Sequence, residues 1–173
     1  PRDLGQRRVR LTFDGAMSHA RVYVNGQEVG YWPYGYNSFY FDITDYVRPG
    51  QRNVLAVRLE NKHESSRWYP GAGLYRNVHL TITEPIHFSP WGTQILTPQV
   101  SKDYARVEVR TRLSGLGTLR SGKLDLEAQL LSPEGKVVAR EQRAGYFGPE
   151  CVDSVFRAGF DLKAPRLWDI GQP

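Results

Sequence analysis

The residues best suited to chemistry form one short segment, residues 65–76, with the sequence Ser-Ser-Arg-Trp-Tyr-Pro-Gly-Ala-Gly-Leu-Tyr-Arg. Within it, Arg67, Trp68 and Tyr69 are followed directly by a Pro-Gly pair. Large flat side chains beside proline and glycine predict a stiff, exposed aromatic loop rather than part of a core. A sugar ring can stack its C–H face on such a surface while charged groups bind its hydroxyl groups. The loop therefore predicts carbohydrate as the ligand class.

The loop is flanked by stretches in which every second residue is apolar, and such stretches are typical of antiparallel strands that bury one face. The alternating apolar positions in the first half of the chain are Val9, Leu11, Phe13, Phe39, Phe41, Ile43, Leu55, Val57, Leu59, Val78, Leu80 and Ile82. Asn25-Gly26 between two extended stretches predicts a tight hairpin, because both turn positions need positive φ. We expect antiparallel strands to hold the loop.

The second half of the chain continues with short strands of a plainer pattern. Pro85 and Pro90 interrupt the alternation, and a domain boundary is expected near residue 86. Beyond it the alternating positions are Val107, Val109, Thr111, Leu113, Leu124, Leu126, Ala128, Leu130, Phe156, Ala158, Phe160 and Leu162. Short strands spaced by turns are typical of a β-sandwich, and at most seven fit here. The sequence predicts an all-β chain with two domains, residues 1–85 and 86–173.

The composition narrows the range of partners. The 173 residues carry 23 basic and 18 acidic side chains, interleaved to a net charge of +5. No nucleic-acid-reading motif and no apolar run long enough to cross a bilayer occur, so neither nucleic acid nor a membrane is a predicted partner. The single Cys151 has no second thiol to pair with. The histidines lack metal-ligand spacing, so no metal or other cofactor is predicted; they are His19, His63, His79 and His87.

In order and spacing, the motifs of the first half resemble those of glycoside hydrolase family 2, the family of the β-galactosidases and β-glucuronidases. The motifs that carry the resemblance are Arg8-Val9-Arg10-Leu11-Thr12-Phe13-Asp14-Gly15, the Val24-Asn25-Gly26 hairpin, Gly35-Tyr36-Asn37-Ser38-Phe39, Asp42-Ile43-Thr44, Asn53-Val54-Leu55-Ala56-Val57 and Gly73-Leu74-Tyr75-Arg76-Asn77-Val78. They cover residues 7–83. Residues 86–173 resemble the immunoglobulin-like domain that follows in such enzymes.

The resemblance implies a sugar-binding jelly roll, with further strands before the position of Arg7, and then an immunoglobulin-like sandwich. It also implies a following TIM barrel that holds the acid/base and nucleophile glutamates of an exo-glycosidase, most like a β-galactosidase. Retaining glycosidases hold two carboxyl groups about 5–5.5 Å apart. The family's acid/base lies in an Asn-Glu pair, and no Asn-Glu dipeptide occurs in residues 1–173. We therefore predict no catalytic residue in this chain and no hydrolysis by the chain alone.

For the loop, the resemblance implies that Arg67, Trp68 and Tyr69 reach the mouth of the barrel pocket and help to hold the terminal sugar. Ser66 stands where some relatives carry an acidic residue that touches the sugar, and it completes the predicted substrate site. The other interpretation is that Trp68 and Tyr69 only pack against a neighbouring domain. A second aromatic cluster is open to the same two interpretations, with the domain contact favoured; it comprises Tyr31, Trp32, Tyr34 and Tyr36.

Two functions of different classes remain open. One is a non-catalytic part of a family 2 glycosidase of carbohydrate metabolism, which shapes and braces the active site with the carbohydrate substrate and the barrel as partners. The other is a stand-alone carbohydrate-binding module, since jelly rolls commonly bind glycans; a structural interaction domain without a ligand is a third. A sheet that lacks its first strands has an open edge, at which copies of the chain are expected to pair as a homo-oligomer.

Overall fold

The computed structural model describes residues 3–64, 66–118, 122–147 and 154–171; Cys151 lies outside them. Nearly all regular structure in these described residues is antiparallel β-strand, and their helices are two short 3₁₀ turns, η1 (Thr44–Tyr46) and η2 (Leu116–Thr118). The predicted all-β fold is thereby confirmed. The chain divides into two compact units, residues 1–84 and 85–173. Each unit is described separately below.

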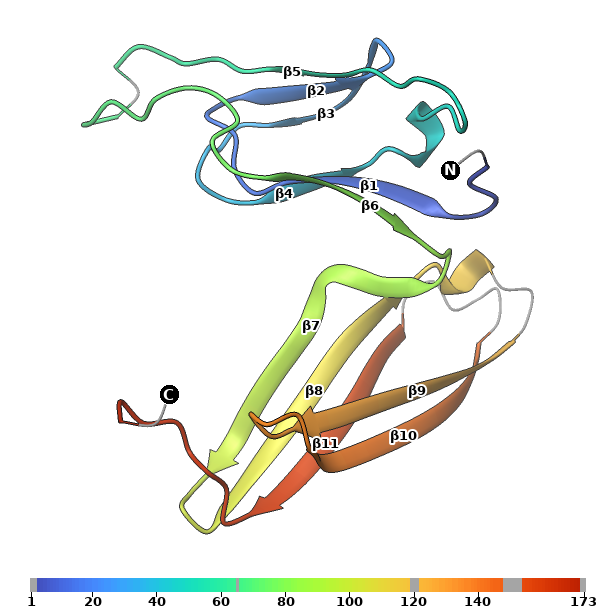
Figure 1. The fold of residues 1–173 in the computed structure, drawn as a ribbon, viewed down its shortest axis with the longest axis vertical. Helices are drawn as coiled ribbons and strands as arrows, with labels where there is room; N and C mark the ends of the chain where they lie inside the picture. Colours follow the sequence, from blue (N-terminus) through green and yellow to red (C-terminus); the bar gives the residue numbers. More distant parts are fainter. Residues whose placement is uncertain (1–2, 65, 119–121, 148–153, 172–173) are drawn as a thin grey trace. The chain divides into compact units, whose positions relative to one another are not determined.

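Unit 1 is a sandwich of two three-stranded antiparallel sheets (Figure 1). The first sheet has the order β4 (Phe39–Asp42), β1 (Arg8–Phe13), β6 (Val78–Thr83), and the second has the order β3 (Gln27–Trp32), β2 (Ala20–Val24), β5 (Leu55–Arg58). The β2–β3 hairpin turns at Asn25 and Gly26, which both have positive φ. The Asn-Gly prediction is therefore confirmed.

The core of unit 1 is aromatic at its centre. Phe13 of β1 and Phe39 of β4 stack with their ring centroids 4.9 Å apart, and the Trp32 ring stacks on Phe39 at 5.6 Å. Val22 of β2 is fully buried with the two phenylalanines. Since Trp32 and Val22 belong to the other sheet, these contacts join the two layers. The period-two pattern of the sequence thus points its apolar side chains into one shared core.

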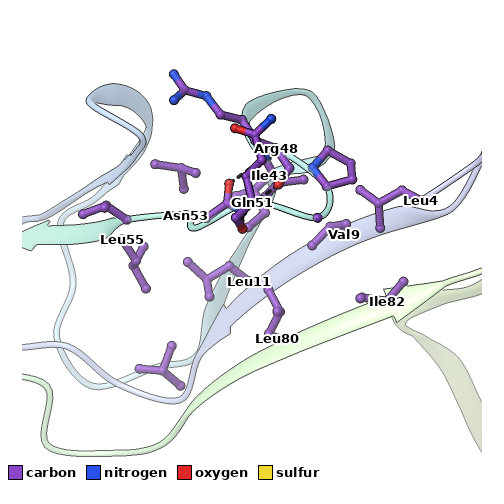
Figure 2. A pocket seen from close by; sticks show the side chains of 16 residues that line it. Leu4, Val9, Leu11, Ile43, Arg48, Gln51, Asn53, Leu55, Leu80 and Ile82 are labelled. Atoms are coloured by element: carbon purple, nitrogen blue, oxygen red, sulfur yellow. Dashed lines mark hydrogen bonds between the residues drawn. The ribbon is translucent and has the colours of Figure 1, made fainter. Parts of the chain in front are cut away.

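One side of this sandwich is open. β5 and β6 end their respective sheets, and between them runs an apolar groove of about 660 Å³ (Figure 2). Its walls include Leu11, Leu55 and Leu80, and Figure 2 places Leu4 near one end of it. The Leu80 side chain is 62% exposed although its strand position faces inward, whereas Leu11, its register partner on β1, is 4% exposed. Inward orientation therefore does not produce burial along the β6 edge.

The turn after β4 is held by Asp42. Its Oδ1 accepts hydrogen bonds from the Thr44 amide (2.9 Å) and the Thr44 hydroxyl (2.5 Å), and its Oδ2 accepts one from Arg8 Nη2 (2.7 Å). Burial raises the pKa of Asp42, but the Thr44 hydrogen bonds and the Arg8 guanidinium outweigh it and hold this pKa below its usual value. The carboxylate therefore ties β1 to the β4 turn.

Unit 2 packs a three-stranded sheet against a hairpin. The sheet has the order β11 (Ser154–Lys163), β8 (Tyr104–Ser114), β7 (His87–Val100), and the hairpin consists of β9 (Gly122–Leu131) and β10 (Val137–Phe147). The described residues thus form five strands, fewer than the seven that the spacing allowed. Ala105, Leu113 and Phe160 are buried between the layers. At Gly115, with φ of 82°, an added Cβ would lie 1.9 Å from the Pro85 carbonyl oxygen, so this turn requires glycine.

A first prediction concerns the open groove. Leu11→Ala should lower the free energy of unfolding by about 2–5 kcal/mol, the range for deleting a buried leucine side chain. Leu80→Ala, at the register partner of Leu11, should change it by only about 0.5 kcal/mol, because that side chain is already in water. Urea unfolding of both variants measures the difference. Equal losses would show that the β6 face is covered in solution.

A second prediction concerns pH. Because the pKa of Asp42 is lowered on folding, its contribution to stability is present at neutral pH and is lost as the pH falls through the folded-state pKa, below about 4. Asp42→Asn removes this contribution. The stability difference between wild type and Asp42→Asn should be constant above about pH 5 and should shrink below about pH 4. Urea unfolding across this range measures it, and a difference that does not vary with pH would contradict the assignment.

Candidate functional site

The predicted loop lies between β5 and β6 in unit 1, on the surface. Trp68 is 62% exposed and Tyr69 is 84% exposed, and Ser66 and Arg67 are exposed as well. These four side chains do not belong to the core. They are therefore accessible within this unit to a ligand or to another domain.

The end of the loop is fixed by backbone pairing. The Met17 amide donates to the Gly73 carbonyl at 3.0 Å and the Gly73 amide donates back at 3.1 Å, so this part of the loop is joined to the segment after β1. Gly73 has a φ of 123°, a conformation that favours glycine. Next to it, the Tyr75 hydroxyl donates to the Gly35 carbonyl at 2.8 Å. The loop is thereby anchored to the segment that connects β3 and β4.

That anchoring brings the two aromatic clusters together. Trp68 Nε1 donates a hydrogen bond to the Tyr36 hydroxyl at 2.9 Å, although the two residues are 32 positions apart. The rings of Tyr34 and Tyr36 meet edge to face with centroids 5.6 Å apart. Tyr34 and Tyr36 are exposed, as Trp68 is. We call Tyr34, Tyr36 and Trp68 the aromatic surface.

The other two members of the second cluster lie elsewhere. Trp32 stacks on Phe39 in the core, and its Nε1 donates to Asn37 Oδ1 at 2.9 Å. Tyr31 bonds through its hydroxyl to His19 Nδ1 at 2.5 Å, and the Arg21 guanidinium lies over its ring. The sequence cluster is therefore divided between a core residue, a paired surface tyrosine and the aromatic surface.

A polar hollow of about 310 Å³ borders the loop. Its lining residues are Asn61, Lys62, His63, Glu64, Ser66, Trp68, Tyr69 and Pro70. Amide, ammonium, imidazole, carboxylate and hydroxyl groups thus lie beside two aromatic rings, and these are the groups that hydrogen-bond sugar hydroxyls. Arg67 does not line this hollow. The sequence analysis did not identify Asn61 to Glu64 as site residues. The one feature that could have indicated them is their position directly before the aromatic loop.

Leu74 and Arg76, at the end of the loop, are both exposed. Arg76 Nη1 donates to the Asp14 carbonyl at 3.4 Å, and its guanidinium lies over the Tyr75 ring. The Asp14 carboxylate instead contacts His79 Nε2 at 3.0 Å.

Within the described residues, no group of three or more His, Cys, Asp or Glu side chains could hold a metal ion. Over the same part of the chain, no helix has the length and apolar character needed to cross a membrane.

The comparison with known families decides the classification. Residues 2–85 match the sugar-binding domain of glycosyl hydrolases family 2. The chain belongs to this family. Among curated relatives, it is 38% identical over 165 residues to the β-galactosidase BoGH2A of Bacteroides ovatus, covering 95% of the chain and 19% of that protein. It is 30% identical to a β-glucuronidase of Bacteroides fragilis, covering 94% of the chain and 24% of that protein.

Solved structures of the family extend the match across both units. A family 2 member from Bacteroides cellulosilyticus superposes with a TM-score of 0.91 at 35% identity, covering 98% of this chain and 22% of that one. The β-glucuronidase of Bacteroides uniformis superposes with a TM-score of 0.84 at 26% identity, covering 97% of this chain and 21% of that one. Nearly all of the 173 residues therefore share the fold of these family 2 proteins, and they span about a fifth of the length of those proteins.

A third prediction tests the contact that forms the aromatic surface. Tyr36→Phe removes the hydroxyl that accepts from Trp68 and keeps the ring. A hydrogen bond contributes about 1 kcal/mol, so cleavage by trypsin after Arg67 should become about fivefold faster as the loop opens more often. Limited proteolysis followed by mass spectrometry measures this rate. Tyr34→Phe keeps both tyrosine rings and the hydrogen bond from Trp68 to Tyr36, so trypsin should cleave this variant at the wild-type rate. An equal acceleration in both variants would contradict the role of that hydrogen bond.

Proposed function

We propose that this chain is a non-catalytic part of a family 2 exo-glycosidase, most like a β-galactosidase, that shapes and braces the active site of a TIM barrel following it. The observation that carries the proposal is the 38% identity with the Bacteroides ovatus β-galactosidase over nearly the whole chain but only 19% of that enzyme. In this proposal residues 1–85 form the sugar-binding jelly roll, and residues 86–173 form the immunoglobulin-like domain. The partners are the barrel and its carbohydrate substrate.

Within that enzyme, the loop has the role of a rim around the terminal sugar. Ser66, Arg67, Trp68 and Tyr69 are the proposed substrate-binding residues. Support comes from their exposure and from the Trp68–Tyr36 hydrogen bond, which holds the indole in one place without covering its face. Ser66 offers a hydroxyl where some family members have an acid, and Glu64 lines the same hollow. We assign Glu64 as the carboxylate acceptor for a sugar hydroxyl at this rim.

The second candidate function is a stand-alone carbohydrate-binding module. The aromatic surface favours it, since three exposed aromatic rings in contact form a platform within one unit. The open groove argues against it, because an independent module completes its sheets. The same groove supports pairing between copies of the chain, which would cover the β5 and β6 edges.

Calorimetric titration separates the two functions. Wild type, Trp68→Ala and Trp168→Ala are each titrated with galactose and a panel of neutral oligosaccharides. Trp168 is an exposed tryptophan in unit 2 and serves as the matched control. We expect no measurable heat from wild type, because the rim holds a sugar only together with the barrel. Millimolar or tighter binding, weakened about tenfold by Trp68→Ala and unchanged in Trp168→Ala, would overturn this and establish the module.

A further inference from the structure

Unit 2 carries a row of arginines on the outer face of its three-stranded sheet. Along β8 the alternate positions are Arg106, Glu108, Arg110 and Arg112, so these side chains leave the sheet on one face. The register places Arg157 of β11 directly opposite Arg110. The next residue on β11, Ala158, is buried, so Arg157 points away from the core, to the face that bears Arg110. Two guanidinium groups therefore face solvent side by side.

The acidic side chains on this face neutralise only part of that charge. Arg106 is paired with Asp161 at 2.7 Å, and Arg110 contacts Glu108 at 3.1 Å. The Arg157 side chain makes no hydrogen bond or ion pair with any described residue. Like charges directly opposite each other in an antiparallel pair destabilise the sheet. Glu108 offsets part of the repulsion between Arg110 and Arg157, and the Arg157 charge keeps no acidic partner among the described residues.

These arginines surround a hollow of about 350 Å³ that three strands build. Gly159 of β11 leaves room at its base, and Arg106 lies across it, since a Cβ added at Gly159 would be 2.2 Å from Arg106 Nη2. From β10, Arg143 joins the lining; its Nε contacts Glu141 Oε1 at 2.7 Å. Glu141 in turn accepts a hydrogen bond from the Gly159 amide at 2.6 Å. The hollow therefore has a fixed base and is lined by four guanidinium groups and the Glu108 carboxylate, and Arg157 is the arginine among them without a described acidic partner.

We propose that this hollow binds the carboxylate groups of an acidic polysaccharide, held between Arg110 and Arg157. The planar guanidinium fork matches a carboxylate with two parallel hydrogen bonds, and two forks on adjacent strands can clamp one group. A carboxylate placed there also removes the repulsion between the two arginines. This site lies outside the loop and the aromatic surface, and it goes beyond the proposed function because it needs no barrel.

Two observations favour an acidic glycan over other polyanions. Single-stranded nucleic acid binds through aromatic side chains on which its bases stack, and among the described residues no aromatic side chain lines this hollow. Several relatives of the chain are named β-glucuronidases, and a glucuronide carries a carboxylate. A uronic-acid carboxylate is therefore the anion proposed for this hollow, and the oligonucleotide in the test below supplies the phosphate alternative.

Oligogalacturonate is the probe for this site, titrated calorimetrically into the full 173-residue chain at low ionic strength. Wild type should bind it and should show no measurable binding of a malto-oligosaccharide of the same length. Arg157→Gln and Arg110→Gln should each weaken binding about tenfold, because each removes one fork of the clamp. Arg157→Lys, which keeps the charge, should also bind more weakly. Arg52→Gln is the matched control, since Arg52 is an exposed arginine of unit 1 and its loss changes the net charge equally.

Thermal unfolding of the same variants distinguishes binding from folding. Without ligand, Arg157→Gln should unfold at the wild-type temperature or higher, because it removes a like-charge pair. Oligogalacturonate should raise the unfolding temperature of wild type and not of Arg157→Gln. Wild-type affinity in Arg157→Gln, or an equal loss in Arg52→Gln, would overturn the proposal. So would tighter binding of a single-stranded oligonucleotide of equal charge, which would assign the face to nucleic acid.

Discussion

The stack of Trp32, Phe39 and Phe13 is the contact on which the rest of unit 1 depends. It joins the two sheets, and it also brings together both ends of the segment between β3 and β4, because Trp32 ends one strand and Phe39 begins the next. The intervening residues are thereby confined to a short surface turn that carries Tyr34 and Tyr36. Trp68 reaches Tyr36 only because that turn is fixed. A buried aromatic stack therefore determines where an exposed tryptophan lies.

Much of the fold could be predicted because its causes are local. Alternation of apolar residues identified β1, β4, β8 and β11, and the Asn-Gly pair identified the first hairpin through its positive φ values. Asn25 also shows what a local rule omits. Its side chain binds the Tyr46 carbonyl and Asn53 Oδ1, and it accepts a hydrogen bond from the Val54 amide, so the hairpin residue holds two distant loops as well.

The candidate sites were harder to predict because their geometry depends on register and on long-range contacts. Periodicity gives the face of a strand but not its partner, so the opposition of Arg110 and Arg157 could not be derived from the sequence. The Trp68–Tyr36 contact joins residues that the sequence separated into two clusters. Leu80 shows a further limit: its inward orientation was predictable, but its burial depends on what lies beside β6.

The hydrogen bond from Trp68 to Tyr36 has a consequence for selectivity. The indole has one N–H donor, and Tyr36 already accepts it, so Trp68 presents a ligand with its ring face alone. A ring face makes no hydrogen bond that would recognise an individual hydroxyl group. It does distinguish the two sides of a pyranose by how many C–H bonds each side presents. An axial hydroxyl concentrates oxygen on one side and leaves a continuous hydrocarbon patch on the other. In the proposed role at the rim, Trp68 would therefore discriminate epimers by stereochemistry, independently of the polar groups in the neighbouring hollow.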